Sequence, residues 1–349
     1  MSNYDQFAAA VKEISGGKNI VLLDDLGLPS VYVPINKLKN SEIISGGSEN
    51  THPAFSVDGV EKSRFLYSKY QNIVINGRAY SLSHRDPKTY VNFDQARQAC
   101  EAKGAGFHLG TLAEWAAVAL LTRKMGTMPH GNNNYGGDSA YTYEKGQESA
   151  KDNNKTGRTF TGSGPATWGH DHTQFGIQDM NGNVWEWLGG MRLNEGEIQI
   201  IPYNNAALGS ECDMSTSSTL WKAIKNDGSL VAPGTAATLK YDFVSGNIQL
   251  TTGITSAQDA GRGGSYTAMT LASGVTAPEL AKALILYPDE PGKDYGGDYH
   301  WMNNSGERSP FAGGGWDDGA HAGVFGLYLS HARSSSGGGV GFRSAYVEL

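Results

Sequence analysis

The sequence has little of several features that would define its class. It holds two cysteines in 349 residues, Cys100 and Cys212, so no disulfide framework can hold the fold together. It has no run of about 18 apolar residues, the length of a membrane-spanning helix, so we expect no membrane insertion. The net charge is −7 and basic residues form no block, so we expect no binding to nucleic acid.

The first residues also lack the marks of a secretory signal. Acidic Asp5 lies near the start, and no apolar core followed by a cleavage site occurs there. We therefore expect synthesis in a reducing cytoplasm without a signal peptide. Charged residues make up only 18% of the chain and glycine occurs 47 times, which favours many tight turns over a helical bundle.

Local patterns predict an α+β chain with two early helices, short strands and long loops. Asn92 can cap one helix, and Thr111 can cap a second, where Glu114 three residues later completes a capping box. Asn76-Gly77 lies between two apolar runs and predicts a β-hairpin, because both turn positions favour positive φ.

The predicted domain boundary falls in a polar segment, residues 41–59, which is rich in turn residues. Residues 1–55 before it are interpreted as a small N-terminal attachment or assembly element. Residues 56–349 would then form the main domain, which is long enough to bury a sizeable core.

Residues 311–343 are the most informative segment, and they contain no Lys, Glu, Gln or Met. Two kinds of position are interleaved in them. The first kind is an apolar and glycine framework: Trp316, Gly319, Gly323, Val324, Phe325, Leu327, Leu329, Ala332, Val340, Gly341 and Phe342. The second kind, called the mixed set below, is Gly315, Asp317, Asp318, His321, Tyr328, Ser330, His331, Ser335, Gly337, Gly338 and Gly339.

The mixed set shares no catalytic chemistry, but its members share a codon neighbourhood. Each residue type in it can arise from an asparagine codon by changes at adenines alone, and the four missing types cannot. This indicates that the mixed set forms a surface whose residues are diversified, whereas the framework positions are kept constant. The alternative is a flexible Gly/Ser-rich tail. Two observations argue against a flexible tail. Residues 324–329 alternate like a strand with one buried face, and large apolar side chains such as Trp316 and Phe325 are not typical of flexible linkers.

Four blocks resemble the formylglycine-generating-enzyme type of C-type lectin fold. The firmest is residues 175–187, FGIQDMNGNVWEW, which closely match that family's FGLxDMxGNVWEW. The other blocks are residues 93–121, 261–266 and 341–343. The resemblance spans about residues 64–349 and implies an α+β C-type lectin fold with an insertion at about residues 192–260.

Segment 311–343 also resembles the variable region of proteins diversified by retroelements, in which template asparagine codons are rewritten at adenine. In such proteins the varied side chains face solvent on the lectin fold and bind ligand. The resemblance implies that the eleven residues of the mixed set are variable ligand-binding positions. It also implies a supporting core, made of Trp316, Phe325, Leu327, Leu329 and Phe342.

These resemblances predict a receptor-binding protein, not an enzyme, on a phage or prophage tail. Its partners would be a host cell-surface protein or glycan, and also the tail or sister subunits, for which a homotrimer fits tail symmetry. The expected location is the virion, after cytoplasmic synthesis. A variable binder displayed on a bacterial surface is an alternative.

An oxidase of the formylglycine-generating type is the rival hypothesis from the enzyme class. Such enzymes use cysteines in the C-terminal part of the fold, whereas this chain has none after Cys212, which lies in the insertion. No catalytic residue is therefore assigned. Cys100 is interpreted as a small buried hydrophobe on the first predicted helix.

Two places carry residues suited to a cation, although no cofactor is required. Asn183 and Glu186 fall where some members of the resembling family coordinate calcium, an ion that prefers hard oxygen ligands. The alternative is that Glu186 is a buried, hydrogen-bonded carboxylate. Residues 170–172, His-Asp-His, are a second candidate metal site, with a hydrogen-bonded loop as the favoured interpretation.

The framework residues should contribute much more to folding stability than the residues of the mixed set. Burial of Phe325 contributes about 2–3 kcal/mol, whereas exchange of an exposed Asp or His changes stability within about 0.5 kcal/mol. Asp298, Asp317 and Asp318 are expected to be exposed loop charges. Four tryptophans are expected in the core: Trp168, Trp185, Trp187 and Trp316.

Overall fold

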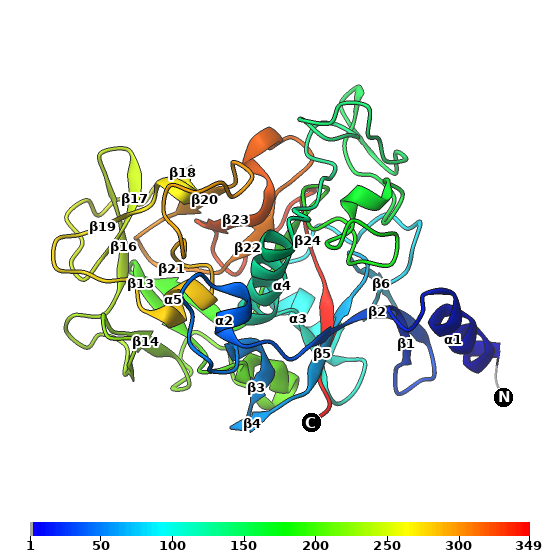
Figure 1. Ribbon diagram of the computed structural model, residues 1–349, viewed down its shortest axis with the longest axis horizontal. Helices are drawn as coiled ribbons and strands as arrows, with labels where there is room; N and C mark the ends of the chain where they lie inside the picture. The colour runs from blue at the N-terminus through cyan, green and yellow to red at the C-terminus, as the bar shows by residue number, and fades with distance from the viewer. Residues whose placement is uncertain (1–2) are drawn as a thin grey trace.

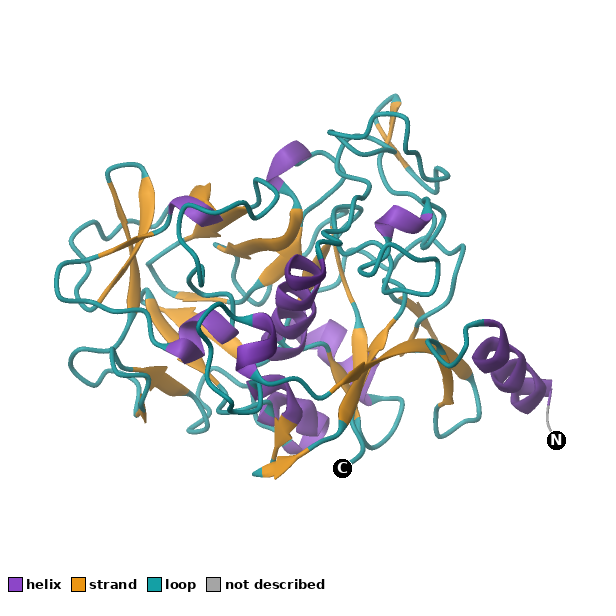
Figure 2. Cartoon of the chain, in the orientation of Figure 1, coloured by secondary structure: helices purple, strands orange, loops and turns teal. Residues whose placement is uncertain are grey.

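The protein combines a few helices with many short strands joined by long loops (Figures 1 and 2). The computed structural model describes residues 3–349. Its α-helices are α1 (Asn3–Ile14), α2 (Asn40–Ile43), α3 (Phe93–Glu101), α4 (Leu112–Met125) and α5 (Glu279–Ala283). None of these helices has the length and apolar character needed to cross a bilayer. The predicted α+β class is confirmed.

Both early helices begin where the capping residues predict. The Asn92 side chain accepts a hydrogen bond from the Gln95 amide at 2.9 Å at the start of α3. At the start of α4, Thr111 Oγ1 accepts from the Glu114 amide at 3.1 Å, and the Glu114 carboxylate accepts from the Thr111 amide at 3.0 Å. These reciprocal bonds satisfy amides that lack a partner within the helix.

The predicted hairpin is also present, between β6 (Ile73–Ile75) and β7 (Arg78–Tyr80). Its turn residues Asn76 and Gly77 have φ angles of 50° and 78°. Two other small hairpins are formed by β3 (Ser56–Val57) with β4 (Val60–Glu61) and by β9 (Lys151–Asp152) with β10 (Lys155–Thr156).

The first large sheet joins the two ends of the chain. Its strands, in spatial order, are β1 (Ile20–Leu23), β2 (Pro29–Asn36), β5 (Arg64–Ser68), β25 (Ser344–Tyr346) and β8 (Phe107–Leu109). The predicted boundary at residue 55 is therefore wrong for residues 20–55, because β2 pairs along its length with β5 and buries Val33 and Ile35 in the core. Helix α1 has no buried residue and projects at the right of Figure 1.

The second sheet is built mainly from the C-terminal part of the chain. Its spatial order is β18 (Arg262–Ser265), β20 (Tyr299–Met302), β23 (Gly323–Leu329), β22 (Phe311–Gly313), β11 (Trp185–Trp187) and β24 (Val340–Phe342). One face of this sheet packs on α4, since Phe325, Leu327 and Leu329 share the main core with that helix. The indole of Trp115 in α4 donates a hydrogen bond to the Val324 carbonyl at 2.7 Å.

The insertion forms a third sheet, at the left of Figure 1. Its strands are β12 (Met191–Asn194), β13 (Glu197–Ile200), β14 (Lys222–Ile224), β15 (Leu230–Val231), β16 (Lys240–Val244), β17 (Asn247–Thr251), β19 (Thr270–Leu271) and β21 (Glu307–Arg308). Met214 and Trp221 from the insertion share a hydrophobic cluster with Phe93 of α3 and Trp187 of β11. The insertion is thus packed against the lectin-type core.

Candidate functional site

One face of the second sheet carries a group of four aromatic side chains, three of them half-buried and one buried. We call it the aromatic face and define it by Trp185 of β11, Tyr299 and Trp301 of β20, and Tyr328 of β23. Trp301 and Tyr328 are paired in register on neighbouring strands, which places their side chains on the same face. Their ring centroids are 5.1 Å apart, and Trp185 lies 5.6 Å from Trp301 and 5.4 Å from Tyr328.

Polar residues of the mixed set surround the aromatic face on both sides of β23. Before the strand, exposed His321 lies against Tyr299, with 3.8 Å between ring centroids. After the strand, half-buried His331 lies 4.7 Å from Tyr328. The fold therefore brings together side chains that precede, belong to and follow β23.

The glycines 337–339 form a third edge of this surface. The Tyr90 amide donates to the Gly337 carbonyl at 3.0 Å, and the Trp185 amide donates to the Gly339 carbonyl at 2.8 Å. A Cβ atom at Gly337 would meet nothing within 4 Å, and one at Gly339 would lie 3.4 Å from Trp316. Neither glycine has a positive φ, so other residues fit here.

Two members of the C-terminal segment differ from the expectation. Gly315 is buried rather than displayed, and its amide donates to Asp318 Oδ2 at 2.6 Å. Trp316 is half-buried rather than part of the core, and its indole donates to Asp152 Oδ2 at 3.4 Å. Both residues lie in the turn that follows β22.

Burial separates the remaining members of the two sets only in part, because Gly319, Ala332 and Val340 of the framework are also half-buried. The expected core residues Phe325, Leu327, Leu329 and Phe342 are fully buried. Asp317 and His321 are exposed. The half-buried members of the mixed set are Asp318, Tyr328, Ser330, His331, Ser335, Gly337, Gly338 and Gly339. Burial raises the pKa of the Asp318 carboxyl, against the opposing effect of the hydrogen bond from Gly315.

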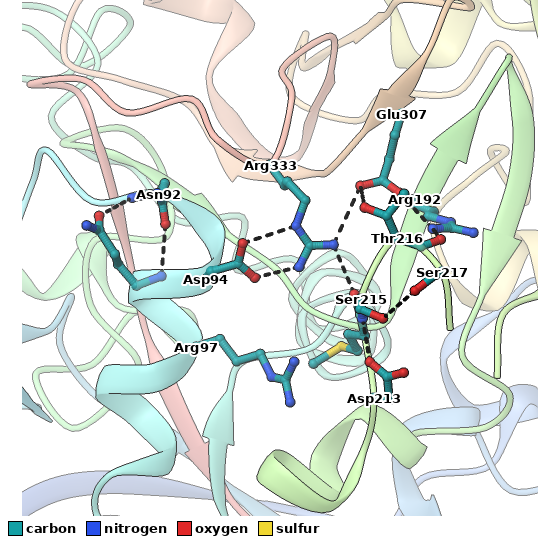
Figure 3. A network of polar contacts seen from close by, with 12 residues as sticks. Asn92, Asp94, Arg97, Arg192, Asp213, Ser215, Thr216, Ser217, Glu307 and Arg333 are labelled. Carbon is teal, nitrogen blue, oxygen red and sulfur yellow. Dashed lines mark hydrogen bonds and ion pairs between the residues drawn. The ribbon is translucent and has the colours of Figure 1, made fainter. Parts of the chain in front are cut away.

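Arg333 anchors the loop between β23 and β24 to the rest of the protein (Figure 3). Its guanidinium Nε donates to Asp94 Oδ2 of α3 at 3.2 Å, and Nη1 donates to the Met214 carbonyl of the insertion at 3.0 Å. Glu307, which pairs with Arg333 at 3.5 Å, also pairs with Arg192 at 2.7 Å. The loop that carries His331 and Ser335 is thus held to α3, to the insertion and to β21 by the contacts of Arg333.

A family model places the chain among known proteins. The model described as the sulfatase-modifying factor enzyme 1-like domain matches residues 39–269. The chain belongs to this family. The predicted C-type lectin fold of the formylglycine-generating-enzyme type is therefore confirmed. No curated protein sequence matches this member of the sulfatase-modifying factor family.

Three solved structures are similar to this family member at low sequence identity. Variable protein 1 of Treponema denticola is 12% identical, with a TM-score of 0.34, over 94% of this chain and 98% of that one. The Major Tropism Determinant P3c Variant is 10% identical, with a TM-score of 0.33, over 94% and 71% of the two chains. The U1 Variant is 10% identical, with a TM-score of 0.32, over 90% and 62%. Scores this low carry no argument about function.

The Asn183 and Glu186 side chains of the family motif are fully engaged with protein partners. The Glu186 carboxylate accepts from Arg343 at 2.7 and 2.9 Å and from Gln71 at 3.0 Å. Asn183 Oδ1 accepts from the Thr159 amide at 2.8 Å, and its Nδ2 donates to Gln71 Oε1 at 2.8 Å. This geometry gives calcium binding at the pair no support, so that hypothesis stays a prediction.

Residues 170–172 are also engaged as a hydrogen-bonded loop. His170 Nδ1 accepts from the Ile177 amide at 2.9 Å, and burial lowers the pKa of His170 to about 4. His172 Nε2 donates to the Met128 carbonyl at 2.9 Å. Within residues 3–349, no group of three or more His, Cys, Asp or Glu side chains is placed to hold a metal ion.

Neither cysteine has the environment of a reactive thiol. Cys100 and Cys212 are free and buried in the cluster between α3 and the insertion. Burial raises the pKa of Cys100 well above its usual value and raises the pKa of Cys212 to about 11. Thiol chemistry requires the thiolate, which such burial disfavours at neutral pH.

Sequence reasoning missed Tyr299 and Trp301, which belong to the aromatic face although they lie outside the C-terminal segment. The available signal was the alternation in Tyr299-His300-Trp301-Met302, in which aromatic residues two apart share one face of a strand. A second miss is Asp298, which is buried rather than exposed, and Asp318, also expected to be exposed, is half-buried. Trp168, Trp185 and Trp187 are buried as predicted.

Proposed function

We propose that the chain is a ligand-binding protein in which segment 311–343 displays diversified residues around the aromatic face. The observation that carries the proposal is the division by burial within one segment. Ten of the eleven mixed-set residues are exposed or half-buried, with Gly315 as the exception, while four of the five supporting side chains are buried.

This division lets one fold present many chemistries. Within β23, Leu327 and Leu329 point into the core while Tyr328, between them, points to the aromatic face. Substitution of the outward residue leaves the inward packing intact. The binding surface can therefore change while the framework keeps the stability of the domain.

The proposed ligand is a protein or glycan on a host cell surface. Trp301 and Tyr328 provide large, rigid contact area at low entropic cost, and Asp317 and His321 provide polar contacts beside them. The proposed setting is a phage or prophage tail, in which repeated copies and sister subunits raise avidity. This finer assignment rests on the resemblance of segment 311–343.

The experiment is a comparison of two displayed libraries. One library varies the ten surface members of the mixed set, and the matched control varies four buried residues, Phe325, Leu327, Leu329 and Phe342. We expect most members of the first library to fold and to change their binding to a panel of intact bacterial cells, and most members of the second to lose the fold. Unchanged cell binding throughout a well-folded surface library would refute the site.

The coding region offers an independent test of diversification. We expect a reverse transcriptase gene nearby, together with a near-copy of the segment that encodes residues 311–343. The two copies should differ at adenines of the template and at the codons of the mixed set. Differences concentrated at framework codons would contradict the proposal.

A further inference from the structure

A cavity of about 480 Å³ lies on the other side of the turn that precedes β23. It is lined by the loop after α4, by residues 294–298 and by the start of the C-terminal segment, including Ala320 and Gly323. A volume of this size is in the range of sites that bind small molecules or a protruding side chain. The cavity is distinct from the aromatic face, which none of its lining residues belongs to.

Asp298 lies at the wall of this cavity and is only 2% exposed. Its Oδ2 accepts a hydrogen bond from the Phe325 amide at 2.7 Å. Among the residues that the structure describes, no Lys, Arg or His forms an ion pair with it. A buried carboxylate without a cation is costly, and burial raises the pKa of Asp298 well above its usual value.

The chain backbone is shaped to keep this carboxyl in place. A Cβ atom at Gly323 would lie 2.1 Å from Asp298 Oδ1, so only glycine lets β23 start this close to the carboxyl. The start of β23 therefore packs directly against the carboxyl of Asp298, which lies just before β20.

The other charges around the cavity do not neutralise Asp298. Arg123 is already paired with Asp289 at 3.3 Å and with Glu290 at 2.7 Å. Asp138 accepts hydrogen bonds from backbone amides, and Asp294 adds a further carboxylate. The cavity is thus acidic, with its one lining arginine compensated elsewhere.

An aromatic side chain completes the cavity wall. Tyr141 is 42% exposed and stacks on His130, with 3.8 Å between ring centroids and 10° between ring planes. His130 is held from behind by Glu144 at 3.0 Å. Tyr141 and Asp298 both line the cavity, and a planar cation against the Tyr141 ring would make a favourable cation–π contact.

We propose that this cavity binds a guanidinium or ammonium group, with Asp298 as its counter-charge and Tyr141 as its aromatic contact. The bound cation would stabilise the ionised form of Asp298, which burial alone disfavours. The group belongs either to a small free amine or to an arginine or lysine side chain of a bound protein. The proposal is independent of the proposed function, because it concerns a different surface.

The experiment titrates the full chain with n-butylguanidinium and, as the uncharged analogue of the same shape, n-butylurea, by isothermal titration calorimetry. We expect saturable binding of n-butylguanidinium and at least about tenfold weaker binding of n-butylurea. Equal affinities for the two compounds, or no saturation by n-butylguanidinium in the millimolar range, would overturn the proposal.

The variants are Asp298→Asn and, as a matched control, Asp58→Asn, at an exposed position outside both the cavity and the mixed set. Asparagine retains a carbonyl oxygen for the Phe325 amide, so the first variant should fold, which a melting curve checks. We expect Asp298→Asn to weaken n-butylguanidinium binding by about tenfold or more and Asp58→Asn to leave it unchanged. Equal binding by a folded Asp298→Asn variant and the parent would refute the role of Asp298.

A capped Gly-Arg-Gly peptide distinguishes the two sources of the cation. Binding comparable to that of n-butylguanidinium assigns the cavity to a protein side chain, because the flanking backbone is then tolerated. Exclusion of the peptide, with n-butylguanidinium still bound, assigns it to a small free amine. Both results support a cation site. If neither n-butylguanidinium nor the peptide binds, the proposal is contradicted.

Discussion

Two neighbouring residues of β23 offer the sharpest test of the division between framework and contact surface. Leu327 is fully buried in the core that includes Trp115 of α4, whereas Tyr328 is half-buried on the aromatic face. Leu327→Ala removes buried methyl groups and leaves a cavity, so we expect the free energy of unfolding to fall by about 3 kcal/mol. Asp317→Asn, at an exposed position, should change it within about 0.5 kcal/mol.

The loss of unfolding free energy on substitution of Tyr328 should fall between these two values. Its ring lies 5.4 Å from Trp185, 5.1 Å from Trp301 and 4.7 Å from His331, measured between centroids. Tyr328→Asn, a change within the codon neighbourhood of the mixed set, loses part of these contacts and should cost about 1 kcal/mol. The expected order of destabilisation is therefore Leu327, then Tyr328, then Asp317.

The assay is urea unfolding followed by tryptophan fluorescence, with calorimetric melting as a second readout. The unfolding entropy of a chain of 349 residues is about 0.7 kcal/mol per kelvin, so a loss of about 3 kcal/mol lowers the melting temperature by about 4 °C. If Asp317→Asn or Tyr328→Asn destabilises the chain as much as Leu327→Ala does, the segment is structural and the division is wrong.

Three further predictions concern the interior. Arg343→Met leaves Glu186 buried without its partner and should cost about 3–5 kcal/mol in urea unfolding, whereas a loss under 1 kcal/mol would show that the ion pair is dispensable. Burial lowers the pKa of His300 to about 3, so on acidification this side chain takes up a proton in the unfolded chain before it does so in the folded one. The free energy of unfolding should therefore fall as the pH drops below about 6.5, by about 2 kcal/mol at pH 5. The variant His300→Phe should abolish this contribution to the pH dependence. Replacement of Cys100 and Cys212 together by serine should leave cell binding unchanged, and a loss of thiol-dependent oxygen consumption in the folded variant would favour the oxidase hypothesis.

Features that depend on neighbours in the chain were predictable. The capping residues Asn92 and Thr111 act on amides three residues away, and the hairpin at Asn76-Gly77 depends on two backbone angles. The inward positions of β23 were likewise visible in the alternation of Leu327 and Leu329 around Tyr328.

Features that depend on distant pairing were not predictable from the same patterns. The strand β2 looked like part of a separate element, but its partner β5 begins 28 residues after β2 ends, in Arg64–Ser68. Trp301 reaches the aromatic face only because β20 pairs in parallel with β23. Asp298 looked like an exposed loop charge because no local pattern shows that the start of β23 packs over its carboxyl.

The sequence by itself determined the family, the early helices and the residues of segment 311–343 that alternate between core and surface, since motifs, caps and strand alternation are written in short stretches of chain. Tertiary structure alone decided which surface those residues share, that Gly315 turns inward and Trp316 outward, and that an acidic cavity opens beside them. The reason is that burial and charge compensation are sums over contacts between segments far apart in the chain, and these contacts exist only once the sheets have formed.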